Sequence, residues 1–342
     1  KVQCHYFLLS SVTATGTKLF LYRCVLSSCS WRLVKFLAAS AVLVLSLQIL
    51  VYELSTDLPT PVLLSEEDYR VLSPQTYKYI LNQPAACKHR TPFLVFMVPV
   101  APQQVEARQA VRKTWGAPGA ETLTLFFMGV PEEQGSGVQE QLEAESGRHA
   151  DIIQMDFVDS YPNLTIKTMM MMNWLATHCP NASYAMKVDS DIFVNIFYLM
   201  QRLRGSPRWG YITGSVIRNG KVRRDSSSKW FVSKQMYPKD RYPTYMSGAG
   251  YVFSSDLAWR ISWASRYVKM IPLEDVYVGL CLQVLDVRPV YSYSLPFMTN
   301  LFEVRDLQYD RCTFARRVIV NGFSPSELVR VWQDFYQGHV HC

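Results

Sequence analysis

Two carboxylates stand two residues apart at the end of an apolar run, in Asp189-Ser190-Asp191. Residues 182–188 before them have the length and apolar character of a buried strand. In an open α/β sheet, ligands bind at the carboxyl ends of strands. Carboxylate oxygens suit Mg²⁺ or Mn²⁺, and these ions also take substrate phosphate oxygens. The pattern predicts a site for a metal and a diphosphate; the alternative interpretation is an acidic pair in a surface turn.

A second acidic pair, Glu274-Asp275, precedes the helical pattern of residues 276–285. Acidic residues at a helix start suit the helix dipole and the capping preferences, which is the structural interpretation. The functional interpretation is general-base catalysis, because a carboxylate in a cleft can take the proton of an attacking hydroxyl. The residues alone leave both interpretations open.

Arg108 and Arg112 form the third candidate feature, because their i, i+4 spacing places them on one face of a helix. Guanidinium groups suit phosphates, and a solvated basic face is the alternative. The formal net charge of +7 is mild for 342 residues, and it fits either a solvated surface or attraction to an anionic ligand. No dense Lys/Arg block indicates nucleic-acid binding.

These side chains need strands and helices to position them, and the sequence predicts both in alternation. Strands are expected at residues 93–100, 122–128, 152–157, 182–188 and 251–254. Helices are expected at residues 103–115, 132–147, 163–178, 256–265, 276–285 and 326–335. The alternation predicts an α/β fold with a mainly parallel sheet flanked by helices.

Residues 36–52 are apolar and uncharged, at the lower edge of the length that spans a bilayer. Basic residues precede them and acidic residues follow: Lys18, Arg23, Arg32 and Lys35, then Glu53, Asp57, Glu66, Glu67 and Asp68. The positive-inside rule favours a cytosolic tail at 1–35, a signal anchor at 36–52, a stem at 53–90 and a luminal domain at 91–342. A buried core helix and a cleaved signal peptide are the alternatives.

Two sequons, at Asn163 and Asn181, are consistent with a luminal domain and predict glycosylation there. The chain has eight Cys, and no spacing among them indicates zinc. Those after residue 52 are Cys87, Cys179, Cys281, Cys312 and Cys342. A luminal location permits disulfides, and the odd number leaves one of the five unpaired or intermolecular.

Taken together, the segments resemble the animal β-1,3-galactosyltransferase family, glycosyltransferase family 31, over residues 84–342. The motifs that carry the resemblance stand in family order at residues 92–95, 108–116, 151–157, 163–168, 187–195, 228–230, 247–251 and 274–282. The resemblance implies a GT-A-like (Rossmann-like) fold, UDP-galactose as donor, Mn²⁺ as cofactor and a type II protein of the Golgi membrane. Asp-Ser-Asp is more similar to the galactosyltransferases than to the related N-acetylglucosaminyltransferases, which usually show Asp-Asp-Asp.

The resemblance also implies roles for single residues and an inverting transfer of galactose to a glycan on a glycoprotein or glycolipid. Asp275 would be the base for the acceptor 3-hydroxyl, and Asp191, helped by Asp189, would hold the metal. Donor-site positions are Arg108, Arg112, Asp156, Lys167, Lys187, Asp189, Ser190 and Asp191. Acceptor and sugar positions are Trp230, Tyr245, Gly248, Gly250 and Glu274.

Two positions depart from the family pattern. Asn321 stands where the family has a His that resembles a metal ligand, and an amide oxygen lacks the imidazole nitrogen that Mn²⁺ accepts. Met246 stands where close members often carry Cys, which fits the odd count. The implied disulfides are Cys87–Cys179 and Cys281–Cys312, with Cys342 free. A catalytically silent member that binds UDP or glycan, and transfer of N-acetylglucosamine, remain alternatives.

Overall fold

The computed structural model describes residues 28–56, 77–132, 137–294, 299–338 and 342. The chain divides into two compact units, Lys1–Pro59 and Thr60–Cys342. In the first, α1 extends from Ser28 to Thr56 and contains the predicted anchor at 36–52. Among the described residues, no helix has the combination of length and apolar character that crossing a membrane requires. The anchor therefore stays a prediction from the sequence.

The second unit is built on a mixed sheet, which has eight strands within the described residues. In spatial order they are β1 (Tyr79–Leu81), β4 (Ile152–Val158), β3 (Thr122–Val130), β2 (Leu94–Pro99), β5 (Tyr184–Val188), β8 (Tyr245–Ser254), β7 (Ile212–Ile217) and β9 (Val290–Tyr291). The central strands β4, β3, β2 and β5 run parallel, whereas β8 runs antiparallel to both its neighbours. The predicted α/β class with a mainly parallel sheet is confirmed.

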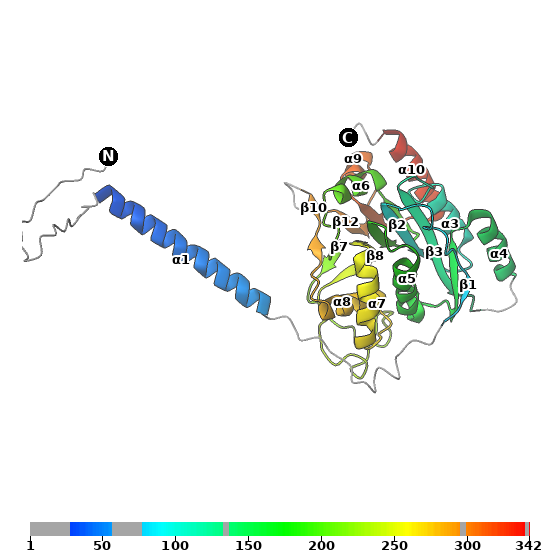
Figure 1. Cartoon of the computed structure of the whole chain (residues 1–342), viewed down its shortest axis with the longest axis horizontal. Helices are drawn as coiled ribbons and strands as arrows, with labels where there is room; N and C mark the ends of the chain where they lie inside the picture. Colours follow the sequence, from blue (N-terminus) through cyan, green and yellow to red (C-terminus); the bar gives the residue numbers. More distant parts are fainter. Residues whose placement is uncertain (1–27, 57–76, 133–136, 295–298, 339–341) are drawn as a thin grey trace, which may run out of the picture. The chain divides into compact units, whose positions relative to one another are not determined.

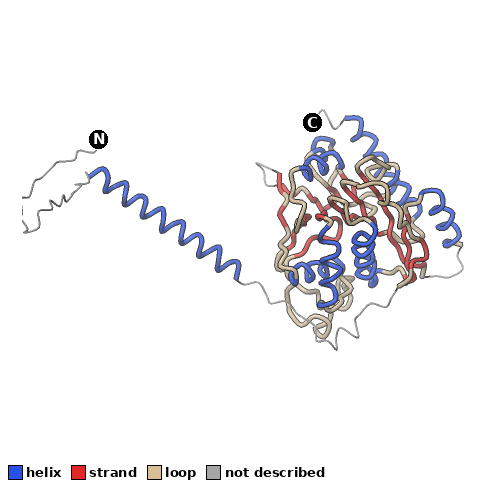
Figure 2. Tube along the Cα trace, viewed as in Figure 1, coloured by secondary structure: helices blue, strands red, loops and turns tan. Residues whose placement is uncertain are grey.

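Helices cover both faces of this sheet (Figures 1 and 2). They are α3 (Val105–Arg112), α4 (Val138–His149), α5 (Leu164–His178), α6 (Ile196–Arg204), α7 (Asp256–Ala264), α8 (Glu274–Val284), α9 (Arg311–Ala315) and α10 (Pro325–Gly338), with 3₁₀ turns η1 (Tyr161–Asn163) and η2 (Ser265–Tyr267). Side chains of β2 alternate between the faces: Val95 and Met97 pack with α5, α7 and α8, whereas Phe96 packs with α3 and α10. The sequence of β2 is a continuous apolar run because the strand is buried on both faces.

A smaller sheet joins the strand after the Asp-Ser-Asp motif to the C-terminal part of the chain. Its order is β12 (Phe302–Asp306), β13 (Ile319–Asn321) and β6 (Ile192–Val194), and a separate hairpin pairs β10 (Tyr293–Ser294) with β11 (Thr299–Asn300). In the antiparallel pair of β6 and β13, Asn321 faces Ile192. The register therefore brings Asn321 beside the residue that follows Asp191.

The predicted stem is too long at its C-terminal end. Residues 79–81 form β1, which pairs with β4 as the edge strand of the main sheet. Cys87 is bonded to Cys179 at a Cα–Cα distance of 5.3 Å, as predicted, and this ties residues 77–90 to the folded unit. Residues 57–76 of the stem lie outside the described part of the chain.

The second predicted disulfide is wrong. Cys312 pairs with Cys342 at a Cα–Cα distance of 5.0 Å, and Cys281 is a free, buried cysteine. Cys281 lies in α8, inside the core between the sheet and α5 and α7, whereas Cys312 lies exposed in α9. The two thiols thus belong to different layers, which leaves Cys342 as the partner of Cys312.

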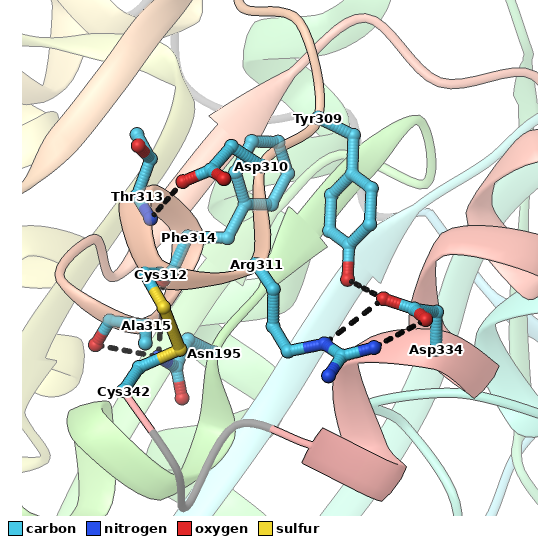
Figure 3. The surroundings of a disulfide bond; sticks show 10 residues. All are labelled: Asn195, Tyr309, Asp310, Arg311, Cys312, Thr313, Phe314, Ala315, Asp334 and Cys342. Atoms are coloured by element: carbon cyan, nitrogen blue, oxygen red, sulfur yellow. Dashed lines mark hydrogen bonds and ion pairs between the residues drawn. A yellow bond between two sulfur atoms is a disulfide. The ribbon is translucent and has the colours of Figure 1, made fainter.

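The Cys312–Cys342 bond is part of a C-terminal clamp around α9 (Figure 3). The side chains of Tyr309 and Arg311 donate to the Asp334 carboxylate of α10, at 2.6 Å and at 2.5 and 3.1 Å. Asn195, at the end of the Asp-Ser-Asp segment, donates from Nδ2 to two carbonyl oxygens of α9 at 3.2 Å. The clamp therefore connects the C-terminus to the segment that carries the acidic motif.

We expect Cys312→Ser and Cys342→Ser to lower the free energy of unfolding equally, by about 3–4 kcal/mol for a loop that spans 30 residues. Urea unfolding of the purified, oxidised protein measures this effect. Cys281→Ala is the matched control, because it leaves both disulfides intact and removes one buried sulfur atom. If Cys281→Ala and Cys312→Ser lowered the free energy of unfolding equally and Cys342→Ser left it unchanged, the result would support the Cys281–Cys312 bond and contradict the Cys312–Cys342 bond.

Candidate active site

The Asp-Ser-Asp motif lies at the carboxyl end of β5, between two main-chain anchors. The Asp189 N–H donates to the carbonyl oxygen of Ala249 at 3.1 Å, and the Phe323 N–H donates to the carbonyl oxygen of Asp191 at 3.0 Å. The chain turns at Ser190 and Asp191 and does not continue extended. Loss of water around the Asp191 carboxyl group, followed by the charge of Asp189, raises the pKa of Asp191. The two carboxylates are thus close enough to repel one another.

Lys187, two residues earlier on β5, is buried beneath this motif. Its ammonium group lies 2.7 Å from a carboxylate oxygen of Asp189 and 3.0 Å from one of Glu274, and it also donates to the carbonyl oxygen of Gly248. Burial alone would lower the pKa of Lys187, but the two carboxylates outweigh burial and raise it. Lys187 is therefore a charged link between the two acidic pairs that the sequence singled out.

Glu274 is buried at the first position of α8. Besides Lys187, its carboxylate accepts hydrogen bonds from the hydroxyl groups of Tyr251 and Thr168, each at 3.3 Å. Burial raises the pKa of Glu274 to about 7, and the positive charge of Lys187 opposes this effect. A carboxylate enclosed in this way supports the site and does not itself meet a large substrate.

Asp275, the next residue, is only partly buried. One carboxylate oxygen accepts the N–H of Gly248 at 3.3 Å, and the other accepts the N–H of Val276 at 2.8 Å. Burial raises the pKa of Asp275, and these backbone hydrogen bonds oppose the shift. Of the acidic pair, Asp275 is therefore the carboxylate that is both held in place and accessible.

Gly248, on β8, allows the two acidic residues to approach the strand. A Cβ atom at this position would lie 2.7 Å from a carboxylate oxygen of Glu274 and 3.5 Å from Cβ of Asp275. Gly250, two residues along, faces Val188 in the register of β5 and β8. The glycines of the Ser247–Tyr251 motif thus bring the start of α8 against the end of β5.

Two of the predicted sugar-site residues, Trp230 and Tyr245, are aromatic, and Trp230 is exposed. The charge of Asp275 acts on the hydroxyl group of Tyr245 and on that of a third aromatic residue, Tyr161. Burial, and then the charge of Asp275, raise the pKa of Tyr161 and also that of Tyr245, the latter to about 12. Tyr161 was not predicted; its place in η1, directly before the Asn163–Thr168 motif, was the available signal.

Arg108 and Arg112 are bound within the protein. The Arg108 guanidinium is fully buried and contacts both carboxylate oxygens of Glu145, at 2.6 and 2.9 Å, and two carbonyl oxygens after β2. Arg112 contacts Glu145 at 2.6 Å and donates two hydrogen bonds of 2.8 Å to the carboxylate of Asp151. These contacts give both residues a role in packing α3 against α4 and the sheet, and their contacts with a donor stay a prediction.

The remaining donor-site predictions, Lys167 and Asp156, lie in different places. Lys167 donates to Asp159 at 2.7 Å and to the carbonyl oxygen of Val100, at the end of β2, at 3.2 Å. Burial, assisted by the charge of Lys187, lowers the pKa of Lys167, so this residue belongs to the surroundings of the site. Asp156 is exposed on β4, where it accepts the N–H of Lys78. The sheet places β3 and β2 between Asp156 and the acidic motif.

The residues around Asp191 suit a metal ion whose other ligands come from a substrate. Among the described residues, no group of three or more His, Cys, Asp or Glu side chains could hold a metal alone. Asp189 and Asp191 offer carboxylate oxygens, and Asn321, across the β6–β13 pair, offers an amide oxygen while its nitrogen donates to Asp306 at 3.4 Å. Such an oxygen set fits Mg²⁺ or Mn²⁺ that also binds phosphate oxygens.

Comparison with known proteins agrees with this site. The sequence profile of the family described as Galactosyltransferase matches residues 106–292, which include both acidic pairs. The mouse protein named β-1,3-galactosyltransferase 2 is 41% identical over 274 residues, which make up 78% of this chain and 64% of that protein. The chain thus spans slightly less than two thirds of the length of that relative.

A second mouse protein, β-1,3-galactosyltransferase 1, is 39% identical over 281 residues, which cover 80% of this chain and 83% of that protein. Among solved structures, the apo bifunctional glycosyltransferase WbbM has a TM-score of 0.39 at 9% identity, over 73% of this chain and 52% of that one. A structural likeness of that size supports no argument about this chain. The profile and the sequence identities, together with the two acidic pairs at one end of the sheet, show that the chain belongs to the galactosyltransferase family.

Proposed function

We propose that the protein is a β-1,3-galactosyltransferase of GT-A-like fold. It transfers galactose from UDP-galactose, with inversion, to the 3-hydroxyl of an N-acetylhexosamine-terminated glycan on a glycoprotein or glycolipid. The observation that carries the proposal is the buried link through Lys187, which contacts Asp189 of one acidic pair and Glu274 of the other. The names of the relatives, β-1,3-galactosyltransferases 1 and 2, support this choice of donor sugar and linkage.

In the proposed reaction, Asp275 accepts the proton of the acceptor hydroxyl. Its carboxylate is fixed by the N–H groups of Gly248 and Val276 and is only partly buried, as a base that meets a large substrate must be. Tyr161 and Tyr245, whose pKa values are raised by burial and by the charge of Asp275, and the exposed Trp230 provide aromatic surfaces against which sugar rings can pack. The acceptor oxygen then attacks the anomeric carbon on the face opposite to UDP, which inverts the α-linkage of the donor.

Asp189, Asp191 and Asn321 would hold Mn²⁺. When bound, the ion supplies charge stabilisation to the departing diphosphate. Lys187 holds Asp189 in place from below, because its ammonium group lies 2.7 Å from that carboxylate. The absence of the family His at position 321 favours one second candidate, a weak or silent member that binds UDP or glycan without efficient transfer.

The proposed location is the Golgi membrane, in type II orientation, with the second unit in the lumen. The supporting features are the apolar segment at 36–52 with basic residues before it, and the Cys87–Cys179 pair, because disulfides form and persist mainly in oxidising compartments.

A donor screen with metal removed and restored separates these candidates. With a chelator present, we expect transfer from UDP-galactose to fall at least about a hundredfold, because a metal contributes several kcal/mol at the transition state. Mn²⁺ should restore the rate. Asn321→His, which supplies the family ligand, should lower the Mn²⁺ concentration at which the transfer rate is half-maximal. UDP binding without transfer would favour the silent member, and a faster rate with UDP-N-acetylglucosamine would overturn the choice of donor.

A further inference from the structure

A hollow of about 460 Å³ lies far from the acidic motif. Residues 180–183, which immediately precede β5, form part of its lining, whereas the motif follows the other end of the same strand. A five-residue strand is about 16 Å long, so the hollow is separate from the candidate active site. Its volume falls within the range of roughly 300–1,000 Å³ that is typical of small-molecule sites.

Two tryptophans line this hollow, and both are unusually exposed. Trp209 has 67% of its surface accessible, and Trp259, on α7, has 53%. Trp209 is held by the guanidinium of Arg260, 5.7 Å from its ring centre, and Arg260 is in turn paired with Asp256 at 3.1 Å. Exposed apolar surface that is gathered around one hollow is typical of ligand-binding and interaction sites.

The polar lining suits a sugar. Arg208 supplies a charged donor at the hollow, and its side chain also donates to the hydroxyl group of Ser183. Asp256 lines the hollow too, but its carboxylate is occupied by Gly210, Ser254 and Arg260. Pyranose rings carry one apolar C–H face and a rim of hydroxyl groups, so they pack on aromatic rings while they hydrogen-bond at the edge.

Asn181, an exposed sequon residue, lines the same hollow. It lies in a turn that follows Cys179, and the disulfide to Cys87 holds that turn to the rest of the fold. A sugar attached at Asn181 would therefore meet the tryptophans at a high effective concentration, because the linkage is covalent and short.

The other sequon residue, Asn163, is in a different situation. Its side-chain nitrogen already donates to the carbonyl oxygen of Val158 at 2.8 Å. The hydroxyl group of Thr165, the third residue of that sequon, is buried and donates to the carbonyl oxygen of Ile271 at 2.7 Å. A glycan there would also stand beside Tyr161, which belongs to the same 3₁₀ turn.

We propose that Asn181 carries an N-linked glycan whose first sugars pack into the hollow between Trp209 and Trp259. This inference rests on the luminal location in the proposed function. In the linkage reaction the Asn181 amide nitrogen bonds to the anomeric carbon of a lipid-linked oligosaccharide diphosphate. The anomeric carbon–oxygen bond breaks, the lipid diphosphate leaves and the amide loses one proton. The packed glycan covers apolar surface that the fold alone leaves in contact with water.

The test uses the full chain expressed in secretory mammalian cells. Glycopeptide mass spectrometry should find Asn181 occupied and Asn163 largely bare. Under native conditions, a glycosidase that cleaves at the first sugar should act several-fold faster on Trp209→Ala and Trp259→Ala than on the unaltered protein. Trp263→Ala is the matched control, because Trp263 is an exposed tryptophan on α7, the helix that carries Trp259, and it does not line the hollow.

A thermal melt separates packing of the glycan from simple attachment. Asn181→Gln should lower Tm, and Trp209→Ala should lower it by less in the Asn181→Gln background than alone, because their contributions are coupled. A bare Asn181, or a glycan removed equally fast from all tryptophan variants, overturns the inference. Neither readout needs transferase activity, so the two proposals can be contradicted separately. An active enzyme with an unglycosylated Asn181 would contradict this inference alone, and a glycosylated but inactive protein would contradict the proposed function alone. An unglycosylated chain with reduced Cys87 and Cys179 would contradict both.

Discussion

Asp275→Asn is expected to lower kcat for galactose transfer by about 10²–10⁴-fold, the usual contribution of a general base. The Asn side chain has one carbonyl oxygen, which can accept the backbone N–H of Gly248 or that of Val276. An amide cannot take up the proton of the attacking hydroxyl group. The Michaelis constant for UDP-galactose should change little, because the donor is assigned to the other acidic pair. Steady-state kinetics with the donor and a glycan acceptor varied in turn measure both constants.

The pH profile of the unaltered enzyme provides an independent check on Asp275. Burial raises the pKa of this carboxyl group, so the acidic limb of the rate profile should lie above the ordinary range for Asp and should disappear in Asp275→Asn. Asp240→Asn is the control, because this carboxylate is 81% exposed. If Asp275→Asn kept the full rate, the assignment of the base to Asp275 would be wrong.

Lys187→Met is expected to lower the free energy of unfolding by about 3–5 kcal/mol near neutral pH, the usual effect of breaking a buried ion pair. The variant leaves Glu274 buried with only two hydroxyl groups as partners, and it leaves Asp189 without its cation. Transfer should also fall, since Lys187 positions both acidic pairs. Urea unfolding across a range of pH values measures the loss.

The loss in Lys187→Met should grow as pH rises. A raised pKa means that the fold favours the protonated Glu274 carboxyl group. Its contribution is present below the unfolded pKa of about 4.5 and is lost as pH rises through the folded value of about 7. Without Lys187 the folded pKa of Glu274 rises further, so the variant is penalised most above pH 7. The Lys187→Met/Glu274→Gln double variant should recover much of the stability, and a loss that does not vary with pH would refute this assignment.

The strands at the centre of the sheet were predictable because the physics that forms them is local. Residues 94–98 and 125–128 are buried on both faces, so their sequences are continuous apolar runs. The strands β6 and β13 have only three residues each and exist because they pair with one another across more than a hundred residues of chain. No local pattern marks such strands, although the register that they set places Asn321 beside the Asp-Ser-Asp motif.

The side-chain contacts that the sequence did not reveal depend on partners from distant parts of the chain. Arg108 and Arg112 have the spacing of a phosphate-binding face, and only the fold shows that Glu145 lies between them. Cysteine connectivity cannot be deduced from spacing alone, so burial of Cys281 decided the pairing of Cys312. Motif order, in contrast, predicted that the two acidic pairs belong together, and Lys187, which contacts Asp189 of one pair and Glu274 of the other, connects them.

The most direct test of the account is the structure of the reaction product. The full chain, with Mn²⁺ and UDP-galactose, is incubated with a glycan that ends in an N-acetylhexosamine, and the product is analysed by nuclear magnetic resonance. We predict one new galactose with the large anomeric proton coupling of a β-linkage, attached at the 3-hydroxyl of the acceptor. An α-linked galactose, attachment at another hydroxyl, or no transfer would contradict the proposed function and the role of Asp275 as its base.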